Sequence, residues 1–197
     1  MKHNSILSAA VFLILIFFIS CSSDQQLMSE QEKQAYIRKG DSLSRLTFDT
    51  LRNTLLRKIL SDGVPGAVRF CQVSASGLTA TFSNEEVEIA RTSMRYRNNL
   101  NKPDSLSFSI LEKMQAEKDN GKEPASMVLR DDKGVVHFYK PILMQAMCLN
   151  CHGSVPGQVQ PVVLSVIDSL YPGDLARQYK DGELRGAWHI RFSERQK

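Results

Sequence analysis

The segment Cys148-Leu149-Asn150-Cys151-His152 constrains this chain more than any other stretch of its sequence. Two cysteines three positions apart project their thiols from one turn, at a separation that lets each thiol add across one vinyl group of a single haem. The adjacent His152 is then placed beneath the iron and supplies an axial imidazole nitrogen. The segment therefore predicts one covalent c-type haem, with thioether bonds at Cys148 and Cys151 and with His152 as an iron ligand.

Two other interpretations of the cysteine pair fit the sequence less well than haem. A structural zinc site needs four ligands, and the sequence offers no second close pair to complete it. A thioredoxin-like redox pair belongs in a βαβ setting, which the pattern of predicted elements lacks. Haem therefore fits the segment best.

Residues 1–20 predict a lipoprotein-type signal peptide. Lys2 and His3 precede an almost unbroken apolar run over residues 6–19, which is shorter than the roughly twenty residues that span a bilayer. Phe18-Ile19-Ser20-Cys21 resembles a bacterial lipobox, so we expect Cys21 to receive lipid and to become the mature N-terminus. Residues 21–28 then form a lipidated, polar tether. The alternative is an uncleaved signal anchor, and either interpretation places the body of the protein outside the cytoplasm, on the periplasmic side of a bacterial membrane.

Residues 29–197 are predicted to form a single α+β domain. The formal net charge of +4 is mild and gives no support for a nucleic-acid partner. Ser29 opens a helix through a capping-box pattern, and Gly63 ends it, with Gly40 as a candidate bend. The order of elements predicts helices packed against a small antiparallel sheet. The further elements are a short helix after Pro65, a strand over 86–92, a helix from Pro103-Asp104 to about Lys118, a hairpin of 126–130 and 135–141, an apolar helix over 161–170 and a strand over 186–192.

The last predicted strand alternates at period two. Trp188, Ile190 and Phe192 share the face that we expect to be buried. His189 and Arg191 lie on the other face, so His189 is expected to be exposed.

The second axial ligand of the iron is left open by residue patterns. With Cys21 assigned to lipid, Cys71 has no cysteine left to pair with in an oxidising compartment. Val64, Val68 and Cys71 recur at helical spacing, so Cys71 is expected to face the interior, either as an inert thiol or as a ligand. His137 is the next candidate. Met147 is too close to the motif to reach the other face of a haem, and the remaining methionines are expected to fill the core: Met94, Met114, Met127 and Met144.

Several further segments, taken in order, carry a resemblance that covers residues 29–194. The chain resembles a family of single-haem c-type proteins with a PAS-like fold. The resemblance implies that Cys71 is the distal iron ligand, opposite His152. The match departs at Asn99, where such sequences often have proline. The segments are Gly66-Ala67-Val68-Arg69-Phe70-Cys71, 90–98 followed by Pro103-Asp104, Tyr139-Lys140-Pro141-Ile142 leading to the cysteine motif, Tyr171-Pro172-Gly173-Asp174 and 182–187.

Three arginines follow one another closely after the strand over 86–92. Guanidinium groups bind carboxylates in bidentate geometry, and haem carries two propionates. Of Arg91, Arg95 and Arg97, we take Arg95 and Arg97 as the candidate propionate contacts. An ordinary solvated basic turn is the alternative.

One-electron transfer outside the cytoplasm is the function expected first, because an iron with both axial positions filled need not exchange a ligand on reduction. The resemblance also implies a redox or gas sensor, which we expect to act through a separate signalling partner. A haem enzyme such as a peroxidase would require an open iron site and ranks last, so no enzymatic activity is expected. Fold-level analogy does not decide among these functions.

Overall fold

The computed structural model describes residues 28–193. The predicted signal peptide, the lipid attachment at Cys21 and all but the last residue of the tether lie outside this range. Among the described residues, no helix is both long enough and apolar enough to cross a bilayer.

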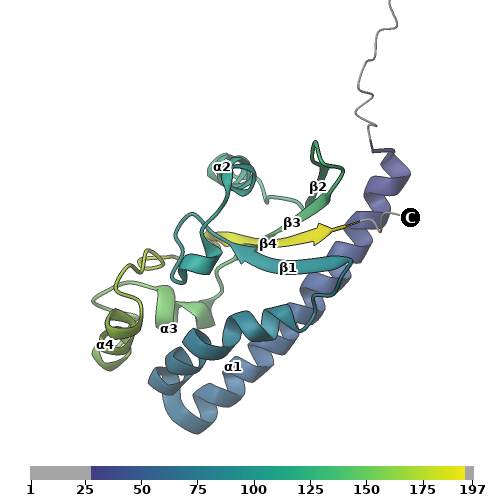
Figure 1. Ribbon diagram of the computed structural model, residues 1–197. Coiled ribbons are helices and arrows are strands. Elements are labelled where there is room, and N and C mark those ends of the chain that lie inside the picture. Colours follow the sequence, from purple (N-terminus) through teal and green to yellow (C-terminus); the bar gives the residue numbers. More distant parts are fainter. Residues whose placement is uncertain (1–27, 194–197) are drawn as a thin grey trace, which may run out of the picture.

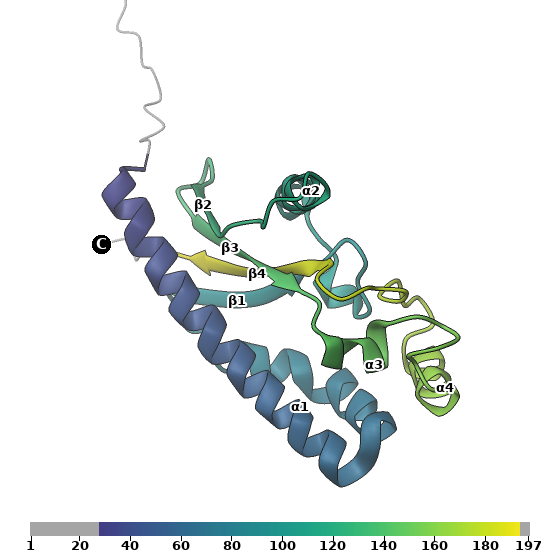
Figure 2. The same ribbon diagram turned by 180° about the vertical axis from the view of Figure 1, so that it is seen from behind.

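A long helical hairpin dominates the fold. Helix α1 (Glu30–Ala80) begins at Ser29, whose hydroxyl accepts a hydrogen bond from the Glu32 backbone N–H, as the capping box predicts. Gly63 adopts φ 68° and ψ 177°, a left-handed conformation that glycine favours, and the chain reverses there. The two arms of α1 lie side by side in both views (Figures 1 and 2). The second arm continues to Ala80 and is longer than the short helix predicted after Pro65.

Four antiparallel strands form the sheet. They are β1 (Val87–Thr92), β2 (Met127–Arg130), β3 (Val136–Leu143) and β4 (Leu184–Phe192), arranged in the order β1-β4-β3-β2. All four correspond to predicted strands, and β2 and β3 pair as the predicted hairpin. Strand β4 is last in sequence, yet it lies between β1 and β3. The predicted α+β class with a small antiparallel sheet is confirmed.

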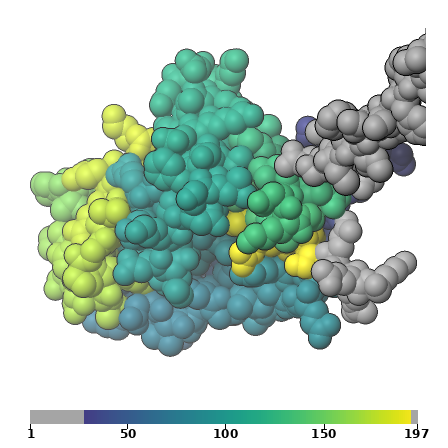
Figure 3. Space-filling view, turned by 45° about the horizontal axis from the view of Figure 1, so that its top comes forward, coloured from purple at the N-terminus to yellow at the C-terminus, as the bar shows by residue number. Residues whose placement is uncertain are grey.

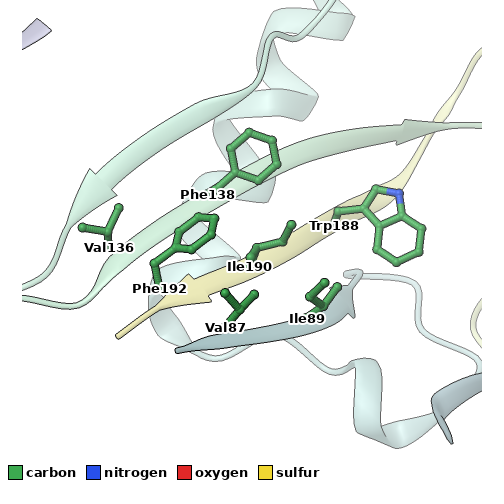
Figure 4. Packing of buried hydrophobic residues seen from close by; sticks show 7 residues of the cluster. All are labelled: Val87, Ile89, Val136, Phe138, Trp188, Ile190 and Phe192. Carbon is green, nitrogen blue, oxygen red and sulfur yellow. The ribbon is translucent and has the colours of Figure 1, made fainter. Parts of the chain in front are cut away.

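The first arm of α1 packs against one face of the sheet. This face carries seven buried apolar residues, which Figure 4 shows together. Gly40 permits the contact, because a Cβ atom built on it would lie 2.4 Å from the Phe138 ring. Gly40 itself stays helical, so the predicted bend at this position is wrong and only Gly63 departs from helical geometry. The seven residues are Val87, Ile89, Val136, Phe138, Trp188, Ile190 and Phe192.

The other face of the sheet is covered by α2 (Ser105–Asp119). The Asp104 carboxylate caps this helix by accepting from the Ser107 N–H at 2.7 Å, as predicted. In the space-filling view the teal residues of this segment lie over the side that faces the viewer (Figure 3). Leu111 and Met114 of α2 pack against Tyr139, so this face is a second buried layer.

His189 lies in that second layer, which corrects the prediction that it is exposed. It is 7% exposed, and its ring stacks on Tyr139 with the centroids 4.3 Å apart. Its Nε2 lies 2.9 Å from Nδ1 of His137, and His137 Nε2 lies 3.1 Å from an Asp131 carboxylate oxygen. The prediction failed because it assumed that only one face of the sheet is covered.

The segment between β3 and β4 packs beside the second arm of α1. It contains η2 (Ala146–Cys148), α3 (Leu149–His152) and α4 (Pro161–Leu170). Val68 of the second arm packs with Val163 and Ile167 of α4. A further 3₁₀ turn, η1 (Asn99–Asn101), follows β1. The cysteine motif is thereby held between the helical hairpin and the end of the sheet.

Candidate functional site

A largely apolar cavity of about 290 Å³ lies where the helical hairpin, the sheet and the cysteine motif meet. Both arms of α1 line it, and β1, β3 and β4 contribute the opposite wall. The η2–α3 segment closes one side. Its apolar lining includes Phe48, Leu51, Leu55, Ile59, Ala67, Val68, Phe70, Ala75, Ile142, Met144 and Trp188.

All three residues of the predicted haem attachment line this cavity. Cys148 ends the turn η2, and Cys151 and His152 lie in the short helix α3 that follows at once. The Cys148 and Cys151 thiols are free. Burial raises the pKa of the Cys151 thiol to about 11, so this sulfur keeps its proton at neutral pH.

His152 is fixed in orientation by a backbone carbonyl. Its Nδ1 lies 2.8 Å from the Ala176 carbonyl oxygen, which can only accept, so Nδ1 carries the proton and donates it. Burial, followed by the charge of Arg97, holds the pKa of His152 well below its usual value, so the ring is neutral. The Nε2 lone pair is left available as a ligand. In metal-binding histidines, the ring nitrogen that does not bind the metal typically donates a hydrogen bond of this kind.

Cys71 lies on the second arm of α1 and lines the same cavity as His152. It is partly buried, as its helical spacing with Val64 and Val68 predicted. Burial raises the pKa of the Cys71 thiol, while the positive charges of Arg91 and Arg97 act in the opposite direction. The structure therefore brings together, on the walls of one cavity, the two residues expected as axial ligands.

His137, the alternative ligand, lies elsewhere. Phe138 faces α1, so its neighbour His137 faces α2 on the other side of the sheet, against His189 and Asp131. Met147 lines the cavity, and so does Met144, which is also buried in a core cluster as predicted. Met94, Met114 and Met127 pack in the layer under α2, as the prediction of core methionines requires.

Arg95 and Arg97 are placed near the motif but are engaged with protein atoms. Arg97 donates to both carboxylate oxygens of Asp174 at 3.1 Å and to the Cys151 carbonyl at 2.6 Å. Arg95 donates to the Arg177 carbonyl, and its guanidinium carbon lies 3.8 Å from the centroid of the Tyr179 ring. Arg97 lines the cavity, and Arg95 does not. Their observed role is to tie the segment after β1 to the chain around the motif.

Besides Arg97, three further arginines line the cavity: the exposed Arg52, and Arg91 and Arg185. Arg91 presents a buried Nε that has no hydrogen-bond partner, and its guanidinium lies 5.9 Å from the Trp188 ring. Arg185 also lines the cavity and donates to the Ser93 hydroxyl. The sequence does indicate that Arg91 faces inward, because the alternation of side chains along β1 places it on the same face as the core residues Val87 and Ile89.

Together, the fold and the site define a class of protein: an α+β domain whose helical hairpin, antiparallel sheet and Cys-X-X-Cys-His segment enclose one apolar cavity. The chain belongs to the Tll0287-like family, whose sequence model matches residues 20–193. The crystal structure of the cyanobacterial heme-protein Tll0287 is similar to this chain, with a TM-score of 0.52 and 20% sequence identity. The match covers 80% of this chain and 98% of that one. No curated protein matches the sequence.

Proposed function

We propose that this protein binds one haem covalently in the cavity and passes single electrons outside the cytoplasm. The observation that carries the proposal is that the Cys148–His152 turn and Cys71 line one apolar cavity. Membership of a family with a structurally similar haem protein supports it.

The residues present fit a haem of c type. Two thiols precede a histidine whose Nδ1 is already bonded, and the buried Arg91 Nε, which has no hydrogen-bond partner, belongs to the lining of the same apolar chamber. Cys148 and Cys151 would hold the group through thioether bonds, and His152 and Cys71 would bind its iron. The haem supplies the one-electron redox couple when bound. The apolar walls exclude water, and the Ala176 carbonyl keeps the His152 ring in one tautomer and one orientation.

Export and lipid anchoring at Cys21 belong to the same proposal, as does the PAS-like description of the domain. The apolar run and lipobox support the anchoring, and attachment of haem to a Cys-X-X-Cys-His segment also takes place outside the cytoplasm. With two axial ligands supplied by the chain, we propose no enzymatic turnover. The electron partner would be a separate redox protein.

The test is covalent haem attachment in a bacterium that matures c-type cytochromes. Denatured wild-type protein should keep its haem colour on a gel and weigh one haem more than the polypeptide, whereas the Cys148→Ser/Cys151→Ser variant should not. Complete extraction of the haem by acid–acetone would contradict the thioether bonds. In the same host, wild-type protein should partition into detergent and Cys21→Ser should not; an unacylated mature N-terminus in the wild type would rule out the anchor.

A redox or gas sensor that acts through a separate partner is the second candidate, and one observation favours it. Burial raises the pKa of the Cys71 thiol. A Cys71 sulfur released from iron would therefore take up a proton and stay off, which is what a ligand switch requires.

A further inference from the structure

The charges that line the cavity are of one sign. Four arginines line it, Arg52, Arg91, Arg97 and Arg185, and no aspartate or glutamate does so among the described residues. A largely apolar chamber with this charge pattern is built for a ligand that brings negative charge of its own, because a buried cation without a partner is costly.

Only two of these four guanidinium groups have neither solvent nor a carboxylate to balance their charge. Arg52 is exposed to solvent, and Arg97 is paired with the fully buried Asp174 carboxylate at 3.1 Å. Arg185 donates to neutral oxygens, the Ser93 hydroxyl and the Arg95 carbonyl, at 2.7 and 3.0 Å. Arg91 has a buried Nε with no hydrogen-bond partner. Within residues 28–193, neither Arg91 nor Arg185 forms an ion pair with a carboxylate.

Arg97 also differs from the two uncompensated arginines in that it is hydrogen-bonded to the cysteine motif. Arg97 donates to the Cys151 carbonyl and acts electrostatically on the Cys151 thiol, so it lies beside the thioether-forming residues. Arg91 lies on β1, where its guanidinium is near Trp188, and like Arg97 it acts electrostatically on Cys71. In any haem the two rings that carry vinyl groups and the two rings that carry propionates lie at opposite edges of the macrocycle. Attachment through Cys148 and Cys151 would therefore turn the propionates away from the thioether-forming residues, to one of which Arg97 is hydrogen-bonded.

We infer that Arg91 and Arg185 form the propionate-binding site of the haem, in place of Arg95 and Arg97. The inference rests on the proposed function, because it assumes that a haem occupies the cavity. Two uncompensated guanidinium groups match two carboxylates, and a planar guanidinium binds a carboxylate through two parallel N–H donors. In a ferric haem with one thiolate ligand, the charges of the iron, the porphyrin and the thiolate sum to zero. The net charge of the group is therefore that of its two propionates.

The experiment is resonance Raman spectroscopy of the ferric holoprotein, read at the bending band of the propionate side chains, which lies at higher frequency when a propionate is hydrogen-bonded. Arg91→Gln removes the charge at similar length and should lower the frequency of this band, and Arg185→Gln should lower it too. Arg95→Gln is the matched control. It removes the guanidinium that lies over Tyr179 and should leave the band unchanged.

A band that moves in Arg95→Gln and stays in place in Arg91→Gln would overturn the inference. Covalent haem in all three variants would show that the proposed function stands even then, whereas wild-type protein without haem would remove both. If Arg91→Gln does not accumulate with haem, the propionate bending band is measured in Arg91→Lys instead. Lysine keeps the charge but lacks the paired donors, so an intermediate shift is expected and an unchanged band counts against the inference.

Discussion

Two opposing effects act on the sulfur of Cys71, and their balance decides what this residue does. Burial in an apolar wall favours the neutral thiol, while Arg91 and Arg97 favour the thiolate. A ferric iron in the cavity would add a much larger positive charge on the side of the thiolate, which is the form that binds metal. An anionic, electron-rich ligand stabilises ferric over ferrous iron, so the reduction potential should fall below that of a Met/His cytochrome.

Substitution of Cys71 by alanine should leave haem attachment intact, because Cys148 and Cys151 are unchanged. The low-spin thiolate signals of the ferric protein should vanish from its electron paramagnetic resonance spectrum, and the reduction potential should rise. External ligands should then bind. Cys151→Ser serves as a comparison that weakens attachment but keeps Cys71. An unchanged ferric spectrum in Cys71→Ala would end the assignment of this ligand.

His189 makes stability depend on pH. Burial, then the neighbouring His137, lowers its pKa to about 4, against about 6.5 for an unfolded histidine. Between these values the unfolded chain binds more protons than the folded one. The contribution of His189 is therefore complete above about pH 6.5 and falls by about 3 kcal/mol as the pH drops to about 4.

Denaturant unfolding of the holoprotein across this pH range measures the effect. In His189→Gln the slope of unfolding free energy against pH should flatten relative to the wild type. Glu123→Gln provides the control away from His189. It removes an ion pair between the exposed Glu123 and Lys118, which is worth less than about 1 kcal/mol, and should keep the wild-type slope. Equal slopes for wild type and His189→Gln would contradict the assignment of the titrating group.

Among the elements, the first arm of α1 depends on one close approach to the sheet. Ordinary helix propensity favours alanine over glycine by about 1 kcal/mol. At Gly40 the added methyl group would lie 2.4 Å from the ring of Phe138, whereas at Gly77, on the same helix, it would meet nothing within 4 Å. The two positions therefore separate propensity from packing.

We expect Gly40→Ala and Gly77→Ala to change stability in opposite directions. Overpacking against Phe138 should destabilise Gly40→Ala by about 1–3 kcal/mol, and Gly77→Ala should stabilise by about 0.5–1 kcal/mol. Both values come from denaturant midpoints of the purified proteins. If Gly40→Ala is as stable as Gly77→Ala, the helix does not approach the sheet as closely as described.

The sequence was informative about elements that depend on local signals and uninformative about contacts between distant ones. The cap at Ser29, the end of the first helical arm at Gly63 and the four strands follow from neighbouring residues and were predicted. The insertion of β4 between β1 and β3 was not, since strand order is decided by pairing across the whole chain. The burial of His189 depends on α2, which lies some eighty positions away.

The candidate site shows the same division. The motif at Cys148–His152 is contiguous, and its placement on one cavity wall follows from a single turn. To choose the propionate-binding residues among three arginines, one must know what each side chain contacts. Arg97 pairs with Asp174, Arg95 contacts a carbonyl and an aromatic ring, and the buried Nε of Arg91 has no hydrogen-bond partner. Spacing in the sequence carries no information about such distant partners.

For the molecule as a whole, the two proposed iron ligands come from different parts of the fold. Cys71 is carried by the second arm of the helical hairpin, which reverses at Gly63, and His152 lies in the segment between β3 and β4. Helix α4 packs against Val68 on that second arm, so the wall that bears Cys71 is held in place by apolar contacts near the ligand. A wall held in this way would favour an iron that keeps both ligands in both redox states, as the proposed electron transfer requires.

This arrangement predicts reversible one-electron reduction, negligible peroxidase turnover and slow binding of carbon monoxide to the ferrous protein. Carbon monoxide must wait for a ligand to leave, so its binding rate should saturate as its concentration rises, whereas in Cys71→Ala the rate should rise in proportion to concentration. Stopped-flow absorbance measures both. Binding within the mixing time in the wild type would show that reduction alone releases Cys71. The raised pKa of the freed thiol would then keep it off the iron, and the sensor would replace the electron carrier as the function of this protein.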